Sequence, residues 1–584
     1  MRTAATPSPV LRAMSRVSSP RLARRAAIGA AAGLIAGTEL PATLGIGPIA
    51  LVLGAGVGVG YRLAFSLPRR AYVDGLMSGA ALGVPLWVLF SVVVFPLSAA
   101  GAPAWTAAGM RALVPHLVAW AVFGAALGLL AQALTDGAER VLGPEPRPQP
   151  APEPSPRRVL VLGGGFAGFS VAKELERRLG PDRSVAVTLV SETNALLFTP
   201  MMAEVAGSSL EPAHISTPLR GALRRSKIVR GSVQSIDLAA RRVAVASDRP
   251  VELAYDQIVL ALGSVTNVFG LEGVLRHASG FKSLRDAIRI RADVIDVFER
   301  AAVEPDAARR KELLTFVVAG AGFAGVELAG AINDFARGMV ADFPSLGPGD
   351  VTVTLVHPGD RILPELSLEL ARYAQERMAA RGVVFRLGER VADARPGAFV
   401  LASGEELRGR TLIWTAGTTP HPLLRTLGVA LTKRGAVVVD SNLSVPGHAG
   451  LWAAGDCAAV SDARTGAPSP PTAQFALREG RVLAANVLAA LRGRPARRFH
   501  FESLGALCVI GHQTACAELR VPFTHRCMRF SGLFAWFLWR TIYLLKLPGL
   551  ERKVRVVADW TLELFFPRDV VQTFEATEAD ARRP

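Results

Sequence analysis

Four apolar stretches dominate the N-terminal part of the chain and cover residues 26–44, 46–66, 75–97 and 113–134. Each has close to the roughly twenty residues that a helix needs to cross a bilayer. Glu39 and Pro41 interrupt the first stretch, so the pattern alone leaves three or four spans open. Four spans place nearly all flanking arginines on one side, as the positive-inside rule requires. We therefore expect a transmembrane four-helix bundle within residues 26–142, with both of its chain ends on the cytoplasmic side.

Glycines recur at intervals of four in all four stretches. This spacing lets helix backbones approach closely, and it predicts tight packing either within one chain or between the copies of a homo-oligomer. The rows are Gly29/Gly33/Gly37, Gly54/Gly58 with Gly56/Gly60, Gly75/Gly79/Gly83 and Gly124/Gly128.

Two polar segments border this region. Residues 1–25 contain six arginines and no acid, a composition that fits a basic cytoplasmic tail or an organelle transit peptide. The whole chain is rich in Ala, Arg, Gly and Pro, so this composition does not mark residues 1–25 as a transit peptide, and we favour the basic cytoplasmic tail. Residues 143–156 carry proline at every second position from Pro144, which predicts a semi-rigid, extended spacer.

After the spacer, short β-branched runs alternate with helical patterns, which predicts an α/β fold. The first such unit contains the G-x-G-x-x-G glycines Gly163, Gly165 and Gly168 between a strand and a helix. Glycines at this spacing allow a tight turn and close approach of a pyrophosphate, and the next strand is followed by Glu192, a carboxylate suited to holding a ribose. The pattern indicates a dinucleotide site.

The chain repeats this device between residues 313 and 332, with Gly320, Gly322 and Gly325. Two such units imply two dinucleotides, held in two apposed Rossmann-like domains so that chemistry can pass between them. Small-residue turns at Gly263, at Gly417 and at Gly455–Asp456 follow predicted strands and would lie beside the bound groups.

The composition favours a membrane location and argues against nucleic-acid and metal partners. Half of the residues are hydrophobic and the mean hydropathy is +0.31, yet the formal net charge is +17, which favours insertion into a bilayer with an anionic surface. We find no basic stripe with interleaved aromatics and no metal-ligand spacing, so we expect neither a nucleic-acid partner nor a metal. The four cysteines all lie in the last quarter and form no C-x-x-C pair.

In this order, the motifs GGGFAG with Glu192, ALGS, AGAGFAGVELAG, WTAG and AAGDCA resemble those of the type II NADH:quinone oxidoreductases. The resemblance covers about residues 157–569 and implies a glutathione-reductase-like fold. It divides the chain into an FAD-binding domain (157–281 and 438–498), an NAD(P)H-binding domain (282–437) and a membrane-associating C-terminal region (499–584). The implied FAD contacts are Gly163, Gly165, Gly168, Glu192, Gly263, Gly455 and Asp456, and the implied NAD(P)H contacts are Gly320, Gly322, Gly325, Glu327 and Gly417.

The quinone side of the resemblance rests on an AQ-x-A segment, matched here by Ala473, Gln474 and Ala476. It implies that Gln474 lies near the quinone and that Glu327 lies near the nicotinamide. Many members carry two glutamines where this chain has Arg478 and Glu479, which leaves the quinone contacts open.

The nucleotide preference is also open. The strand VTVTLV after the second glycine motif ends in His357, where an NAD site should carry an acid. NADH remains the expected donor, and NADPH the alternative.

The tail holds an aromatic, apolar stretch at residues 532–549 that includes Arg540 and Lys546. One interpretation places Trp536, Trp539 and Tyr543 at lipid headgroup level, with Arg540 and Lys546 against anionic lipid. The other is a buried helix that closes the domain.

The expected function is hydride transfer from NADH to FAD and then electron transfer to a membrane quinone, without proton pumping, by a multi-pass protein of the cell (inner) membrane whose catalytic domain is cytoplasmic. A sulfide:quinone oxidoreductase would need cysteines near the flavin, where only Cys457 is available. A membrane redox sensor or assembly factor is the alternative outside enzymes.

Overall fold

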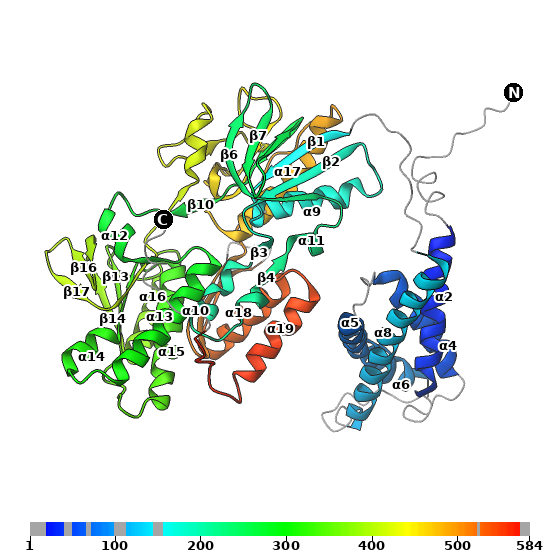
Figure 1. Cartoon of the computed structure of the whole chain (residues 1–584), viewed down its shortest axis with the longest axis horizontal. Helices are drawn as coiled ribbons and strands as arrows, with labels where there is room; N and C mark the ends of the chain where they lie inside the picture. The colour runs from blue at the N-terminus through cyan, green and yellow to red at the C-terminus, as the bar shows by residue number, and fades with distance from the viewer. Residues whose placement is uncertain are drawn as a thin grey trace. The chain divides into compact units, whose positions relative to one another are not determined.

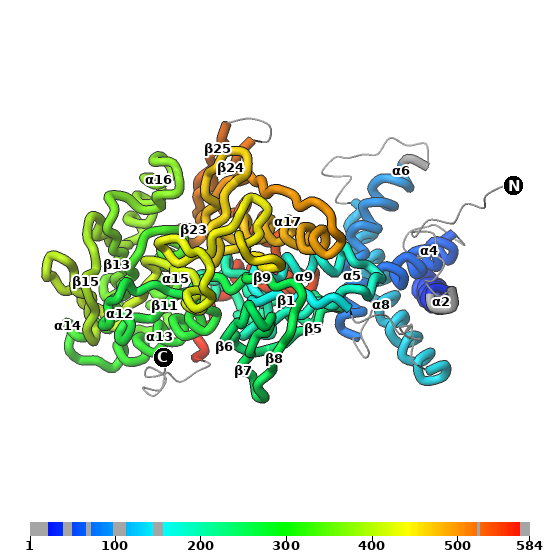
Figure 2. The backbone as a smooth tube through the Cα atoms, turned by 90° about the horizontal axis from the view of Figure 1, so that it is seen from above, coloured from blue at the N-terminus to red at the C-terminus, as the bar shows by residue number. Residues whose placement is uncertain are grey.

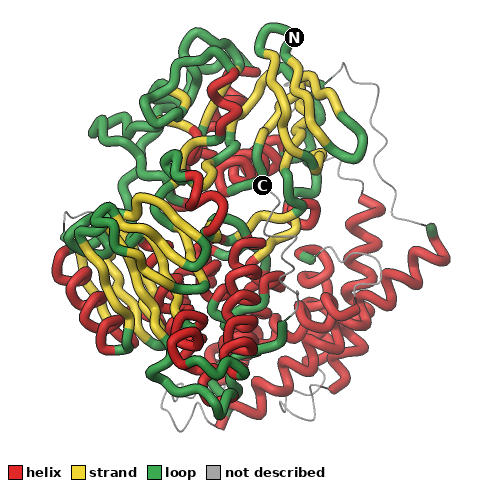
Figure 3. Tube along the Cα trace, turned by 60° about the vertical axis from the view of Figure 1, so that its left-hand side comes forward, coloured by secondary structure: helices red, strands yellow, loops and turns green. Residues whose placement is uncertain are grey.

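A computed structural model of the chain describes residues 19–39, 49–65, 72–98, 112–143, 156–521 and 526–572. The chain divides into two compact units, Met1–Pro152 and Glu153–Pro584 (Figure 1). The described part of the first unit is helical, whereas the second combines sheets with covering helices (Figure 3). The spacer predicted at residues 143–156 lies almost entirely outside the described residues, as does the basic tail apart from its last residues.

The first unit is built from long apolar helices. Its elements are α2 (Ser19–Ala36), η1 (Gly37–Glu39), α4 (Ile49–Ala64), α5 (Tyr72–Leu86), the π-helix η2 (Trp87–Val94), α6 (Phe95–Ser98) and α8 (Val114–Leu142).

Glycine contacts join these helices in pairs. A Cβ atom added at Gly33 would overlap the carbonyl oxygen of Gly54, and one added at Gly79 would overlap that of Gly124. Helices α2 and α4, and likewise α5 and α8, therefore pack backbone to backbone, as the four-residue spacing predicted. This close approach occurs inside one chain. Gly56 is different, because nothing lies within 4 Å of a Cβ added there.

Two hydrogen bonds show which helix ends meet. Arg24 at the start of α2 donates to the carbonyl of Gly143 after α8 (3.1 Å), and the hydroxyl of Tyr61 at the end of α4 donates to that of Gly75 at the start of α5 (3.3 Å). The first and last helices thus begin and end at the same end of the bundle, as four antiparallel spans require.

Among the residues that the structure describes, two helical stretches meet the length and hydropathy expected of a membrane span. They are Tyr72–Val94, with 23 residues, and Val114–Leu142, with 29; Ile49–Ala64 is apolar but shorter. The last helix continues beyond the predicted end at residue 134 and buries Gln132, Thr135 and Asp136 in its final turns. Four spans remain a prediction.

The second unit contains two five-stranded parallel sheets. The first has the order β21-β9-β1-β2-β5, and its central strand buries Val159 to Leu162, as a sheet covered on both faces requires. Helix α17 lies against α9 on this sheet (Figure 2). These elements are β1 (Arg157–Leu162), α9 (Phe166–Leu179), β2 (Val185–Ser191), β5 (Lys227–Arg230), β9 (Gln257–Leu260), β21 (Leu451–Ala453) and α17 (Ala473–Leu491).

The second sheet has the order β11-β18-β12-β13-β14 and repeats the same strand-turn-helix device. Its helix α15 packs on β13. The elements are β11 (Ser279–Gly280), α13 (Leu284–Ala302), β12 (Thr315–Ala319), α15 (Phe323–Met339), β13 (Thr352–His357), α16 (Leu368–Ala380), β14 (Val383–Leu387) and β18 (Thr411–Trp414).

Smaller elements connect and cover the two sheets. Within the first domain they are β3 (Ala195–Leu197), η3 (Thr199–Met201), α10 (Met202–Ala206), η4 (Pro212–Ile215), β4 (Ser216–Pro218), α11 (Leu219–Ala222), β6 (Ser232–Asp237), β7 (Arg242–Ala246) and β8 (Val251–Ala254). Further along they are β10 (Ser264–Thr266), α12 (Glu272–His277), α14 (Ala307–Leu313), η5 (Val340–Asp342), β15 (Val391–Arg395), β16 (Ala398–Leu401), β17 (Glu406–Arg408), β19 (Thr418–Pro420), η6 (Pro422–Thr426), β20 (Val437–Val438), η7 (Gly455–Cys457) and β22 (Ala458–Ala459).

The C-terminal region is a three-stranded antiparallel sheet followed by two helices: β23 (Gly505–Gly511), β24 (Thr514–Arg520), β25 (Cys527–Ser531), α18 (Gly532–Lys546) and α19 (Leu550–Leu562). The placement of Trp536 and Trp539 at lipid headgroups is wrong, because they are only 3% and 1% exposed and belong to the main core. Helical periodicity turns Phe534 and Phe537 to the opposite, exposed face. The helix is therefore core on one side and apolar surface on the other.

Candidate functional site

The first glycine loop forms a cradle at the carboxyl end of β1. Gly163 has φ +108°, and a Cβ there would overlap the carbonyl oxygen of Ala261, so only glycine fits. Gly168 packs its backbone on Gly163 in the same way. Gly165 caps α9 and has nothing within 4 Å of an added Cβ. Free helix N–H groups thus face open space, which fits a pyrophosphate.

The second loop repeats this geometry at the end of β12. Gly320 also has φ +108°, and Gly325 packs against its carbonyl. Gly322 caps α15, and its added Cβ would meet only the Glu365 carboxylate, at 3.4 Å. The residues of both loops therefore fit a dinucleotide each.

The strands beside the two loops end differently. Glu192 follows β2, the neighbour of β1, and is exposed where a ribose-binding carboxylate should lie. In the second domain, β13 ends in His357, whose Nδ1 accepts from the Ala321 amide (3.3 Å). Partial burial lowers the pKa of His357, which favours the neutral imidazole. The two ribose positions are thus chemically distinct.

The Gly455–Asp456 turn is held from two sides. The Gly455 amide donates to the buried carboxyl of Glu479 (2.7 Å), while Asp456 accepts from the Ser264 hydroxyl (2.7 Å), with the Lys282 ammonium 3.6 Å away. Burial, with Asp456 nearby, raises the pKa of Glu479 to about 7. Sequence reasoning included Ser264 in the ALGS motif without assigning it a role, missed Lys282, which no motif marks, and treated Glu479 only as a departure from the family pattern.

The turns at Gly263 and Gly417 lie at the join between the two sheets. Gly263 has φ +70° and precedes β10, which pairs antiparallel with β19 just after Gly417. The Gly417 carbonyl also accepts from the Asn267 amide (3.0 Å). This two-stranded link fixes one dinucleotide-binding domain against the other.

Glu327 and Gln474, the two predicted catalytic residues, both contact strand β23. Glu327 lies in α15 and accepts from the Val509 amide (3.3 Å), while Gln474 in the first turn of α17 donates to the Gly505 carbonyl (3.2 Å). Gly505 and Val509 are four positions apart along the strand, about 13 Å. Gln474 also donates to Ser503 (3.2 Å). The C-terminal region thus connects the second glycine loop to the AQ-x-A segment.

Ala473 and Ala476 complete that segment. Ala473 begins α17, and Ala476 is buried with its Cβ 3.8 Å from a Cβ added at Gly455. The segment therefore lies directly against the Gly455–Asp456 turn, so that the predicted quinone side and the predicted flavin side share one wall.

Comparison with known proteins assigns the chain that carries these features to a family. Residues 157–480 match the model of the pyridine nucleotide-disulphide oxidoreductases, and residues 503–569 match the NDH2 C-terminal domain. The Mycobacterium tuberculosis protein named type II NADH:quinone oxidoreductase Ndh is 31% identical over 441 residues, 73% of this chain and 92% of its own length. This chain belongs to the type II NADH:quinone oxidoreductases. A Dictyostelium discoideum protein named probable NADH dehydrogenase is 30% identical over 71% of this chain and 90% of its own length.

Solved structures agree on the fold of this type II oxidoreductase. NDH2 from Plasmodium falciparum, solved in complex with NADH, has a TM-score of 0.65 at 18% identity and covers 71% of this chain and 100% of that one. The sulfide:quinone oxidoreductase of Aquifex aeolicus has a TM-score of 0.52 at 20% identity, covering 70% of this chain and 96% of that one. At such identities the likeness shows the fold alone.

The cysteines of this oxidoreductase do not support the alternative of a sulfide:quinone oxidoreductase. Cys457 is buried with its thiol 3.3 Å from the Ala454 carbonyl, and burial raises its pKa to about 11. It is therefore held as a thiol and not as the thiolate that attacks sulfur.

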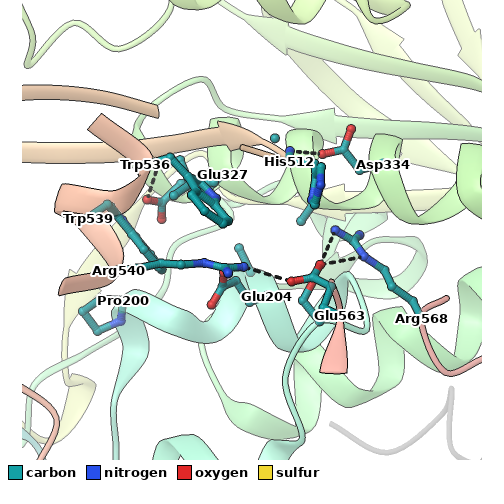
Figure 4. A pocket seen from close by; sticks show the side chains of 15 residues that line it. Pro200, Glu204, Glu327, Asp334, His512, Trp536, Trp539, Arg540, Glu563 and Arg568 are labelled. Carbon is teal, nitrogen blue, oxygen red and sulfur yellow. Dashed lines mark hydrogen bonds and ion pairs between the residues drawn. The ribbon is translucent and has the colours of Figure 1, made fainter. Parts of the chain in front are cut away.

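Glu327 also lines a cavity between α10, α15, β23, α18 and the segment that follows α19 (Figure 4). Burial, aided by the charge of Glu204, raises the pKa of Glu327 to about 8, so it is protonated at neutral pH. Burial likewise raises the pKa of Glu204 to about 7.

Arg540 organises the rest of this cavity. Its guanidinium lies over the ring of Trp536, 3.8 Å from the centroid, and forms ion pairs with Glu563 (2.9 Å) and Glu204 (3.8 Å). Sequence reasoning assigned Arg540 to lipid. A single arginine inside an apolar helix was the signal for a buried ion pair, but its partners lie 336 positions before and 23 positions after it, and only the fold brings them together.

Proposed function

We infer that this enzyme carries two electrons from NADH through FAD to a quinone, with the balance NADH + H⁺ + quinone → NAD⁺ + quinol. The observation that carries this conclusion is the pair of glycine cradles at Gly165 and Gly322, joined by the β10–β19 link. Support comes from the alignment with the mycobacterial type II NADH:quinone oxidoreductase over nearly its whole length.

Each of the predicted site residues has a distinct role in this reaction. The N-terminal amides of α9 and α15 bind the two pyrophosphates, Glu192 binds the adenosine ribose of FAD, and Asp456 binds FAD near its flavin end. Bound FAD supplies the hydride acceptor and the electron donor. Glu327, which burial keeps protonated and uncharged, orients the nicotinamide, and Gln474 lies near the quinone.

A spectrum tests this assignment. Anaerobic addition of NADH to the purified protein should bleach the flavin bands, and a soluble quinone should restore them. Bleaching without recovery would favour a redox sensor, in which the nucleotide domains report to the helical bundle. The absence of a flavin spectrum would contradict the whole assignment.

NADPH is a second donor that one observation favours. No carboxylate ends β13 to repel a 2′-phosphate, because His357 stands there. We expect NADH to be the better substrate and NADPH to be used measurably. Replacing His357 with Glu should lower kcat/KM for NADPH at least tenfold while NADH use persists. Equal effects on both donors would contradict this role.

We further propose two membrane attachments, the helical bundle as a multi-pass anchor and the C-terminal region as a docking surface. The exposed apolar side chains of that region include Met528, Leu533, Phe534, Phe537, Leu545, Leu550, Leu562, Leu564, Phe565 and Phe566. Such a surface suits the lipid interface, from which a hydrophobic quinone would enter.

Liposome binding tests the docking surface. Residues 157–584 should bind anionic liposomes, and replacing Phe534 and Phe537 together with serine should weaken binding about tenfold without loss of FAD, because both rings are exposed. The matched control replaces Phe269, an exposed ring elsewhere in the unit, and should bind as the parent does. Binding that survives the double substitution would assign the docking surface elsewhere.

A further inference from the structure

Two cations of the C-terminal third of the chain, Arg478 beside Gln474 and Lys546 at the end of α18, have no carboxylate partner among the described residues. Arg478 lies one turn after Gln474 in α17 and donates from its guanidinium to the Gln474 carbonyl (3.0 Å). The guanidinium lies over the Phe501 ring, 4.2 Å from its centroid. Lys546 ends α18, with its ammonium 5.7 Å from the Tyr543 ring. Across the part of the chain that the structure describes, no carboxylate lies within 4.0 Å of either cation.

Other positive charges act on both cations. The charge of Arg478 adds to partial burial in lowering the pKa of Lys546, and the charge of Arg481 adds to burial in lowering the pKa of Arg478. The nearest acid in sequence, Glu479, points away and accepts from the Gly455 amide. Like charges placed together without a counter-ion are unfavourable, and a bound anion would relieve the repulsion.

The position of this pair matters because Gln474 is the proposed quinone contact. The side chain of Arg478 therefore carries a positive charge one helical turn from Gln474. The guanidinium is held in place by both the ring and the carbonyl, which presents its remaining N–H donors in a fixed direction.

We propose that Arg478 and Lys546 select quinones that carry a negative charge at neutral pH, such as ring-hydroxylated quinones ionised at the hydroxyl group. This inference rests on the proposed function, since it assigns a substrate class to the same acceptor site. The overall balance is unchanged: the ionised quinone takes two electrons and two protons and leaves as the corresponding anionic quinol.

The test compares two naphthoquinones with the full-length enzyme. 2-Hydroxy-1,4-naphthoquinone is ionised at pH 7, and 2-methyl-1,4-naphthoquinone is neutral. The measured quantity is the ratio of their kcat/KM values, which cancels their different reduction potentials when variants are compared. Arg478→Gln and Lys546→Gln should each lower this ratio about five- to tenfold, and Arg478→Lys should retain most of it. Arg494→Gln removes an equal charge three residues after the end of α17 and should leave the ratio as in the parent.

Salt gives a measurement that needs no variant. Raising the ionic strength should lower the ratio for the unaltered enzyme, because exposed charge interactions are screened. A ratio that is insensitive both to salt and to the two glutamine substitutions would overturn the proposal, as would an equal fall in Arg494→Gln. If NADH bleaches the flavin and neither quinone restores it, the proposed function itself fails, which is a distinct result.

Discussion

At the residue scale, the cofactor cradle depends on a glycine whose side-chain space is empty. An added Cβ at Gly165 meets nothing, unlike those at Gly163 and Gly168, which would overlap backbone. A side chain at Gly165 should therefore be tolerated by the fold and should occupy the volume of the pyrophosphate. This separates binding from stability at one position.

Gly165→Val is accordingly expected to fold and to lack FAD, with a loss of at least 90% of the flavin absorbance per protein and little change in far-ultraviolet circular dichroism. Gly338→Val is the matched control, since a Cβ added at Gly338 also meets nothing and Gly338 lies in α15 away from the loop. Full FAD retention in Gly165→Val would contradict the cradle.

A second residue-scale prediction concerns pH. Burial raises the folded-state pKa of Glu479 to about 7, above its ordinary value of 4.5. The folded protein therefore takes up a proton on this group between these values, and stability falls as the pH rises from about 4.5 to 7. Glu479→Gln keeps an oxygen for the Gly455 amide and removes this loss. It should gain about 2 kcal/mol relative to the parent at pH 8 and little at pH 4.5, measured as a thermal midpoint shift of a few degrees. Glu252→Gln, an exposed control, should show no such difference.

At the element scale, helix α4 of the bundle has two rows of glycines, of which one packs against α2 and the other does not. Gly54 and Gly58 of α4 touch the α2 backbone, whereas Gly56 and Gly60 have nothing within 4 Å. The spacing is identical, so the sequence cannot distinguish the packed row from the free row. Only the rotation of α4 about its axis does so.

Gly58→Leu should therefore separate α2 from α4 and lower the thermal midpoint of the full-length protein in detergent by several degrees or abolish its folding. Gly56→Leu, two residues away, should melt as the parent does. Equal destabilisation by both substitutions would contradict the helix pairing.

At the scale of the whole molecule, an exposed cysteine allows the orientation of the protein in the membrane to be measured. Cys527 is exposed, and Cys457, Cys508 and Cys516 are buried. An impermeant maleimide should label inside-out vesicles and leave right-side-out vesicles unlabelled, because the catalytic unit is proposed to be cytoplasmic. Cys527→Ser should abolish the signal. A tag at the N-terminus should report the same side, and opposite sides would contradict four spans.

Much of this protein was determined by local sequence. Glycine spacing predicted both dinucleotide loops because a positive φ and backbone contact admit no other residue at Gly163 or Gly320, and the apolar periodicity predicted the parallel sheets around them. The tertiary structure decided everything that depends on which face a helix turns inward. It placed Trp536, Trp539 and Arg540 in the core instead of at lipid, gave Glu479 its amide partner, and fixed the Arg478 guanidinium over the Phe501 ring. Burial and charge proximity are sums over residues distant in sequence, so they set the ionisation and exposure of these side chains only once the chain has folded.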